Sequence, residues 1–397
     1  MFDKDVYIIV SNTVNEYHGS LTVNNTRINA FENILGFYND FDYGKVVNFK
    51  LIDTLPKDSI KLIINFSMLP LHPNIYLEDN IIDYINKTDN TYFWMFSPHE
   101  ATLDFNILKQ ALKDKKINNN KVIISNNSYY YHTRCKEDIK FVCIKDWWES
   151  YYKFHLRVWD DVSFVSPETR LKHLQTANKK VLTLNRNIKD FRIWNYYALI
   201  KTGLYNDSHV SYHIPTIAMK NNINYIDLVD SAVKFFENDT RRDIMITDKL
   251  YISKNLDKLD NRHIINYKDN IIPYYNDSLT SVVVESLLDE NFITEKSYKA
   301  ITHSHPFIVV GHKDIQHRLR LDGYKTFDEL YEEDGISSLE TALKVYKHLQ
   351  SYDINVMRKD IQDKYMQIVD YNFNHFFERK PSFSTHINDI KHTLSKT

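Results

Sequence analysis

The sequence of 397 residues contains only seven glycines, and this scarcity excludes the commonest backbone sites for phosphate. It has neither a G-x-x-x-x-G-K loop nor a G-x-G-x-x-G loop, in which glycines let backbone N–H groups approach a phosphate. Any phosphate that the chain binds must therefore be held by side chains and helix ends.

Cysteines and long apolar runs are also scarce. The two cysteines, Cys135 and Cys143, are too few for a disulfide framework or a four-cysteine zinc site. No run of eighteen apolar residues occurs, so we expect no membrane-spanning helix. The chain starts with acids before a short apolar segment, unlike a signal peptide. We therefore expect a cytoplasmic protein.

The formal net charge of -2 argues against binding to nucleic acid by bulk attraction, although a local basic groove stays possible. With 43% hydrophobic and 26% charged residues, the composition is that of a folded globular protein. The length favours two domains. Abundant Asn, Ile, Lys and Tyr are typical of an AT-rich genome, such as that of a phage or other virus, and the compartment would then be the host cytoplasm.

Short β-rich segments alternate with helix-like segments in the first part of the chain, which favours an α/β domain with a mainly parallel sheet. The expected strands are Val6–Val10, Val46–Leu51, Lys61–Phe66, Tyr92–Phe96, Lys121–Ile124 and Phe141–Ile144, and Leu103–Lys113 is an expected helix. We assign residues 1–160 to this domain and 161–178 to a linker.

A second α/β domain is expected over residues 179–370, followed by a helical tail over 371–397. Its expected strands are Val181–Leu184, Val210–His213, Ser281–Glu285 and Phe307–Gly311. Its expected helices are Phe191–Thr202, Leu228–Phe236, Glu295–His303, Leu339–Leu349 and Val356–Phe377, and Gly203 is placed to end the first of them. In such sheets ligands bind beyond the carboxyl ends of the strands.

The most informative segment is Asn291-Phe-Ile-Thr-Glu-Lys296, which lies between two of these strands. Thr294 can cap the helix that follows, which leaves Glu295 and Lys296 in its first turn. A helix N-terminus and Lys296 suit a diphosphate, and a carboxylate can accept hydrogen bonds from ribose hydroxyls. Read alone, the same residues also fit an ordinary helix start with a solvated lysine.

Phe292–Lys296 followed by Pro306–Val310 resembles the donor-site motif of the α-1,3-fucosyltransferase family and related viral glycosyltransferases. The resemblance implies that Glu295 contacts the ribose and Lys296 the diphosphate of a nucleotide-sugar donor. We also predict that Glu285 and Thr294 bind the donor, Thr294 through its hydroxyl. It also implies a GT-B-like α/β fold, in which two Rossmann-like domains face each other across a cleft, with C-terminal helices. The second domain would then bind the donor and the first the acceptor.

Two further segments resemble the same family. Val181–Arg192 is similar to the opening of the donor domain, where an arginine binds the donor phosphates, so Asn185, Arg186, Lys189 and Arg192 are candidates. Tyr92–Ala101 resembles a segment that ends in the general base for the acceptor hydroxyl. The order of residues differs here, so Glu100 and His99 are both candidate bases.

We expect no metal site. His303, His305 and His312 flank one strand without a nearby cluster of carboxylates or cysteines, and Asp40-Phe-Asp42 lies in a turn-like context.

The sequence thus predicts a metal-independent glycosyltransferase, a hexosyl- or pentosyltransferase, whose co-substrate is a UDP- or GDP-sugar. The acceptor is a hydroxyl of a glycan or of a hydroxymethylated base in viral DNA. The alternative is a non-catalytic protein of the same fold that binds a sugar nucleotide or a carbohydrate. Donor sugar, stereochemical outcome and oligomeric state have no signal in the sequence.

Overall fold

A computed structural model defines the fold. It describes residues 4–10, 45–66, 75, 77–97, 105–127, 139–144, 147–158, 164–185, 190–212, 225–235, 240–250, 252, 271–285, 291, 293–331, 339–380 and 382–396. Within these ranges, no helix combines the length and apolarity that crossing a membrane requires.

The chain divides into two compact units. The first comprises Met1–Phe154 together with Lys380–Thr397, and the second comprises His155–Arg379. Among the described residues each unit has one sheet, and every strand pair in both sheets is parallel. The predicted α/β class with two Rossmann-like units is therefore confirmed.

The first unit has a sheet of six strands in the order β2-β1-β3-β4-β5-β6. Its strands are β1 (Val6–Val10), β2 (Val46–Asn48), β3 (Ile60–Phe66), β4 (Thr91–Ser97), β5 (Val122–Asn126) and β6 (Lys140–Cys143). Its helices are η3 (Phe49–Thr54), α2 (Asp79–Lys87), α3 (Phe105–Asp114), η4 (Asn119–Lys121), α5 (Trp147–Val158), which runs into the second unit, and α19 (Phe383–Ser395).

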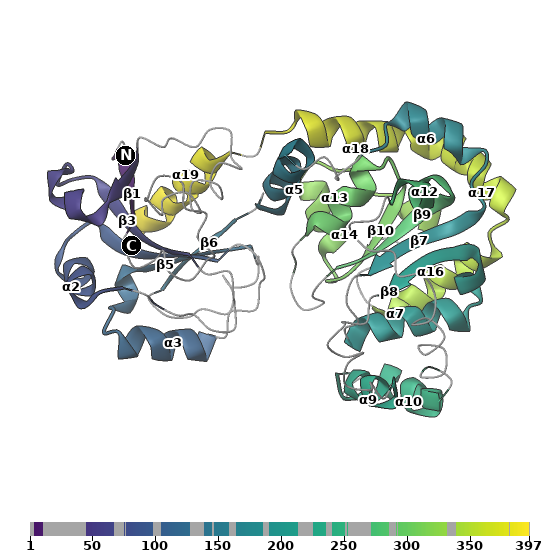
Figure 1. Ribbon diagram of the computed structural model, residues 1–397, viewed down its shortest axis with the longest axis horizontal. Coiled ribbons are helices and arrows are strands. Elements are labelled where there is room, and N and C mark those ends of the chain that lie inside the picture. The colour runs from purple at the N-terminus through teal and green to yellow at the C-terminus, as the bar shows by residue number, and fades with distance from the viewer. Residues whose placement is uncertain are drawn as a thin grey trace. The chain divides into compact units, whose positions relative to one another are not determined.

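Alternating side chains along these strands build two cores, as the period of a β-strand requires. Ile63 and Phe93 belong to a core with apolar residues of α2 and α3, whereas Leu62 and Trp94 belong to a core with Phe383 and others from α19. Helices thus cover both faces of the sheet (Figure 1).

Helix α19 is fixed to the first unit by a buried polar contact inside its apolar core. Trp94 Nε1 donates a hydrogen bond of 2.8 Å to Ser125 Oγ, and His386 Nε2 of α19 lies 2.9 Å from the same oxygen. The last residues of the chain, expected to form a tail, therefore complete the first unit.

The second unit has a sheet of four strands in the order β10-β9-β7-β8. Its strands are β7 (Lys179–Asn185), β8 (Ser208–Tyr212), β9 (Ser278–Val284) and β10 (Phe307–Val310). Its helices are α6 (Pro167–Leu174), α7 (Asp190–Lys201), η5 (Leu204–Asp207), α9 (Tyr225–Phe235), α10 (Thr240–Thr247), α12 (Ile272–Asn276), α13 (Glu295–Thr302), α14 (Ile315–Leu321), α15 (Asp328–Tyr331), α16 (Leu339–Ser351), α17 (Ile354–Asp360), η6 (Ile361–Tyr365) and α18 (Met366–Glu378). Residues 161–178, expected to form a linker, include α6.

The direction of the strand order reverses within this sheet. After β7 the chain moves outward to β8, whereas after β9 it moves to β10 on the other side. Because parallel crossovers are right-handed, α7 and α13 must lie on opposite faces of the sheet. In accord with this, α7 packs with α9 and α16, and α13 packs with α18 (Figure 1). Such a reversal opens a crevice beyond the carboxyl ends of the two central strands, here β7 and β9.

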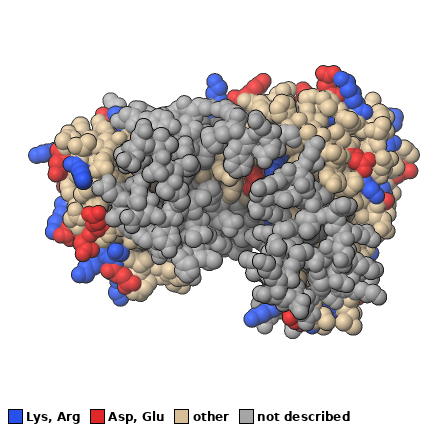
Figure 2. Space-filling model, viewed as in Figure 1, with Lys and Arg blue, Asp and Glu red and all other residues tan. Residues whose placement is uncertain are grey.

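Charges on the described surface are mixed. In Figure 2, acidic and basic side chains lie interspersed over the described parts of the face in view. This distribution accords with the small net charge.

Gly323 generates a prediction about stability. It follows the C-terminus of α14 with φ +89°, and a Cβ there would lie 2.7 Å from two ring atoms of His375 in α18. We expect Gly323→Ala to lower the free energy of unfolding by about 2–4 kcal/mol, since it adds overpacking to the strain of a left-handed backbone.

The matched control is Gly203→Ala. Gly203 has φ +80°, and among the described residues no atom beyond its chain neighbours lies within 4 Å of where the new methyl group would stand. We expect this variant to cost only the backbone strain, about 1–2 kcal/mol. Urea unfolding measures both variants, and equal losses would contradict the packing account.

Candidate functional site

The candidate site lies at the carboxyl ends of β7 and β9, where the strand order reverses. Asn185 is the last residue of β7, and Glu285 directly follows β9. The register pairs Val181 with Thr280 and Leu182 with Ser281, so these two strands end side by side.

Glu285 is buried without any exposed surface, and its carboxylate accepts three hydrogen bonds. Oε1 accepts from the backbone N–H of Thr294 at 3.0 Å and from Ser297 Oγ at 2.8 Å. Oε2 accepts from Thr294 Oγ1. The loss of hydration of a buried carboxylate is offset by such bonds, and these bonds fix the start of α13 against the end of β9.

Thr294 is the N-cap of α13, as the sequence predicts. Its Oγ1 accepts from the Lys296 backbone N–H at 3.4 Å and from Lys296 Nζ at 3.1 Å. Lys296 Nζ also lies 3.1 Å from Glu295 Oε1. The cap, the acid and the lysine therefore form one connected group in the first turn of the helix.

Glu295 is ionised at neutral pH. Burial raises its pKa, but the charges of Lys296 and Lys299 and hydrogen bonds from Lys296 and the backbone outweigh this and leave the pKa at about 2. Its side chain is 26% exposed, so the carboxylate is accessible to a ligand. An ionised, partly exposed carboxylate of this kind can accept hydrogen bonds from vicinal hydroxyls.

Both helices beside the crevice carry a cation in the first turn. Arg192 is the third residue of α7 and is 2% exposed, and Lys296 is the second residue of α13. A cation is unfavourable there, because the N-terminus of a helix already has a partial positive charge. The same first turns also contain an acid, Asp190 in α7 and Glu295 in α13, and Lys296 pairs with Glu295. Each N-terminus therefore combines backbone N–H groups and a cation, which suit a bound anion, with a carboxylate.

Two buried amides near this edge have unsatisfied oxygens. Asn185 is 1% exposed and Asn291 is 6% exposed, and neither Oδ1 atom has a hydrogen-bond partner among the described residues. Asn185 Nδ2 donates to Thr183 Oγ1 at 3.3 Å. Buried polar atoms are normally paired, so these two oxygens are able to accept hydrogen bonds from a ligand or from water.

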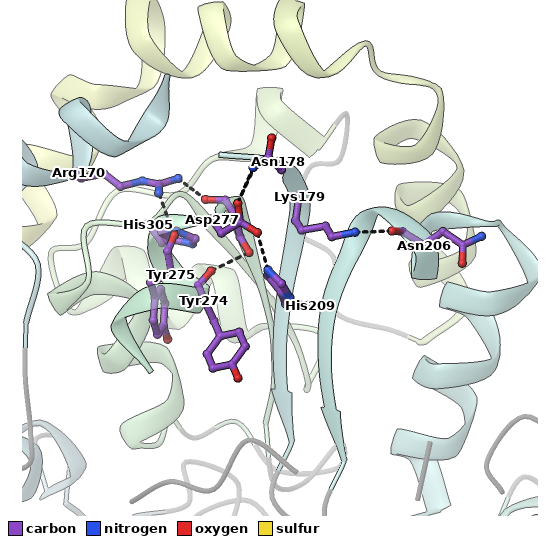
Figure 3. A network of polar contacts seen from close by, with 10 residues as sticks. Arg170, Asn178, Lys179, Asn206, His209, Tyr274, Tyr275, Asp277 and His305 are labelled. Atoms are coloured by element: carbon purple, nitrogen blue, oxygen red, sulfur yellow. Dashed lines mark hydrogen bonds and ion pairs between the residues drawn. The ribbon is translucent and has the colours of Figure 1, made fainter. Parts of the chain in front are cut away.

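The opposite edge of the same sheet holds a polar network in which the protein uses its own groups (Figure 3). Arg170 is fully buried and donates to the backbone oxygens of Tyr275, Ser278 and Leu279. Burial lowers the pKa of Arg170 to about 9.

His209 Nε2 lies 2.8 Å from Asp277 Oδ2 in this network, and Asp277 also accepts two hydrogen bonds from Asn178. Because the contacts join the starts of β7, β8 and β9, we assign the network to the stability of the fold.

The three histidines around β10 do not converge. His303 and His305 precede the strand and His312 follows it, so they lie at opposite edges of the sheet. Among the residues that the structure describes, no group of three or more His, Cys, Asp and Glu side chains is placed to hold a metal ion.

Four of the sequence-predicted residues lie outside the described residues, namely Glu100, His99, Arg186 and Lys189. In the sequence, the first two follow β4 within three residues of its end, and the other two lie between β7 and α7. Their roles stay predictions.

Sequence reasoning missed Ser297 and the buried amide of Asn291. The Ser297 hydroxyl lies one turn after the cap and donates to Glu285. A serine three residues after a helix cap is common, so the sequence gives no signal for this contact. Only its hydrogen bond to Glu285, at the end of β9, gives it a role.

No family model and no curated protein matches the sequence. Among solved structures, the chain is similar to two UDP-forming α,α-trehalose-phosphate synthases, from Burkholderia xenovorans and Burkholderia vietnamiensis. Their identities are 10% and 9% and their TM-scores 0.36 and 0.38, over 87% and 88% of this chain and 75% of each of theirs. The wall teichoic acid polymerase TagF is 12% identical with a TM-score of 0.28, over 98% of this chain and 88% of its own. Likenesses at this level do not establish function, and the fold itself is established by the strand order and register.

The buried histidines generate a prediction about pH. Burial lowers the pKa of His303 to about 4, and burial with the nearby Arg170 charge lowers the pKa of His305 well below 6.5. The unfolded chain therefore binds more protons than the folded one below about pH 6.5. The free energy of unfolding should fall as the pH drops from 6.5 to 4, by up to about 1.4 kcal/mol per pH unit for each histidine.

The replacement His303→Phe keeps the stacking on Tyr275, whose ring centroid lies 4.1 Å away, and removes one titrating group. Urea unfolding between about pH 4.5 and 8 should then show a shallower slope than in the wild type. The control is the same replacement at His317, which is exposed, and the slopes of the two variants are compared. An unchanged slope in His303→Phe would count against the account.

Proposed function

We propose that the chain is a glycosyltransferase that moves a sugar from a nucleotide-sugar donor to an acceptor hydroxyl. The observation that supports this best is the pair of helix N-termini, α7 and α13, each with a cation in its first turn, beside the β7–β9 reversal. This is where an α/β sheet binds a nucleotide, and the charge suits a diphosphate.

The donor is a UDP- or GDP-sugar. Lys296 and Arg192 contact its diphosphate, with Arg186 and Lys189 as further candidates from the sequence. The ionised Glu295 accepts hydrogen bonds from the ribose hydroxyls, as its low pKa and partial exposure allow. The Oδ1 atoms of Asn185 and Asn291 take N–H or O–H donors of the same ligand.

In the reaction, the acceptor oxygen forms a bond to the anomeric carbon while the bond from that carbon to the donor phosphate oxygen breaks. Glu100 or His99 takes the proton of the acceptor hydroxyl as general base. The nucleoside diphosphate leaves with the electron pair, and Lys296, Arg192 and the helix ends stabilise its charge. These groups supply the stabilisation in a mechanism that we propose to be independent of metal.

A hydroxyl of a glycan and a hydroxymethyl group of a viral DNA base both offer an alcohol oxygen as the nucleophile, and both are candidate acceptors.

The rival function is that of a non-catalytic protein that binds a sugar nucleotide or carbohydrate. Incubation with radiolabelled UDP- and GDP-sugars distinguishes the enzyme from the binding protein. An enzyme slowly hydrolyses its donor or labels an acceptor, whereas a binding protein shows only saturable binding of the donor.

Lys296→Ala tests the donor site. Loss of a full charge beside the leaving diphosphate should lower kcat/KM at least tenfold, since charge-assisted contacts to phosphate contribute about 1.5–3 kcal/mol. Turnover of the donor found in the screen measures it, with thermal unfolding to check the fold.

The control is Lys172→Ala, which removes an exposed lysine that pairs with Glu168 on α6. We expect its kcat/KM to equal that of the wild type. Intact turnover in Lys296→Ala would rule out the assigned donor site.

A further inference from the structure

We propose that Glu285 and Thr294 do not contact the donor but are positioning residues, which hold the Lys296 ammonium ready for the diphosphate. The inference rests on the proposed function, because it assumes that Lys296 binds the donor. It concerns a chain of three hydrogen-bonded groups, from the ammonium through the hydroxyl to the buried carboxylate.

Glu285 has no surface that is open to a ligand. Its residue is 0% exposed, and both carboxylate oxygens already accept hydrogen bonds from the start of α13. A donor molecule could reach it only if the helix moved away from β9. Its contribution to donor binding must therefore pass through the residues that it holds.

The hydroxyl of Thr294 is also fully used. A threonine hydroxyl has one hydrogen and two lone pairs. The hydrogen is donated to Glu285 Oε2, and the oxygen accepts from the backbone N–H and from Nζ of Lys296. Thr294 is 1% exposed, so its hydroxyl is almost completely withdrawn from solvent.

The hydrogen bond from the Thr294 hydroxyl to Glu285 Oε2 sets the direction of this chain. Because the hydroxyl hydrogen is used in that bond, the lone pairs of its oxygen turn toward Lys296. The lysine side chain, which is 20% exposed, thus has a fixed acceptor at 3.1 Å, and a second contact to Glu295. A flexible lysine held in this way loses less conformational entropy when a diphosphate binds.

The conservative variant Glu285→Gln tests the direction directly. Its amide oxygen can still accept from the Thr294 N–H and from Ser297, which leaves the amide NH₂ facing the Thr294 hydroxyl. The hydroxyl must then accept from the amide, which leaves one lone pair for the two donors of Lys296 and weakens the acceptor of the ammonium. Thr294→Val removes the acceptor outright, and Thr294→Ser keeps it.

Ser297→Ala is the matched control, because it removes one hydrogen bond to Glu285 and leaves the chain from Glu285 to Lys296 intact. A purely structural role would make donor affinity follow stability in every variant. Under the positioning role, donor affinity and stability do not change together, because Ser297→Ala then loses stability with little change in affinity.

The experiment is calorimetric titration of the full-length protein with UDP and with GDP, accompanied by thermal unfolding of each variant. For the nucleotide that binds, we expect Glu285→Gln and Thr294→Val to weaken affinity about tenfold. Thr294→Ser and Ser297→Ala should stay within about twofold of the wild type. In a Lys296→Ala background, Thr294→Val should cause almost no further loss, because the two residues act as one unit.

The outcomes distinguish the two proposals. If the wild type binds neither UDP nor GDP, the proposed donor site fails, and the positioning role fails with it. If the wild type binds but Thr294→Val binds equally well, or weakens binding as strongly in the Lys296→Ala background, the positioning role alone is overturned.

Discussion

The buried carboxylate of Glu285 joins the end of strand β9 to the start of helix α13, and the carboxyl edge of the second unit depends on that junction. Helix α13 has eight residues, too few to be stable by itself, and its first turn is held by bonds to Glu285 from Thr294 and Ser297. Removing a partner from such a buried charge is costly, whereas the complete set offsets its desolvation. The positions of Glu295 and Lys296 follow from this junction.

The two edges of the second sheet use polar groups differently. At the amino edge, Arg170 and His305 bind backbone oxygens, and the interactions close the ends of α6 and α12 onto the strands. At the carboxyl edge, the oxygens of Asn185 and Asn291 have no partner within the described part of the chain, and helix N-termini carry cations. Arg170 Nε, Asn276 Oδ1 and His303 Nε2 at the amino edge also have no partner within the described part of the chain, so unpaired atoms do not distinguish the two edges. The cations in the first turns of α7 and α13 do distinguish them, and they favour an anionic ligand at the carboxyl edge.

Local sequence patterns predicted most of the described helices and strands. The strand at Val6–Val10 has the predicted bounds, and the α13 cap at Thr294 follows from a side chain that accepts backbone hydrogen bonds. Long-range contacts could not be predicted in this way. The return of α19 to the first unit depends on His386 meeting Ser125, which lies 261 residues away, and no local pattern encodes that meeting.

The candidate site shows the same division. The positions of Glu295 and Lys296 in a first helical turn were readable from a motif, because a helix start and its charges are local. That Glu285 is enclosed by the start of α13 and that the Thr294 hydroxyl is fully used emerges only from the contacts between the end of β9 and the start of α13. The sequence therefore identified the segment around Glu295 and Lys296. The hydrogen-bond geometry shows that these two side chains are partly exposed, whereas Glu285 and Thr294 are buried and hold the start of the helix.

The most direct test of the central claim is hydrogen–deuterium exchange of the full-length protein with and without the UDP- or GDP-sugar that it binds. The account predicts slower exchange in the peptide that covers residues 293–299, with no change at residues 274–279 on the amino edge. Protection confined to the amino edge or to the first unit, with residues 293–299 unaffected, would contradict it.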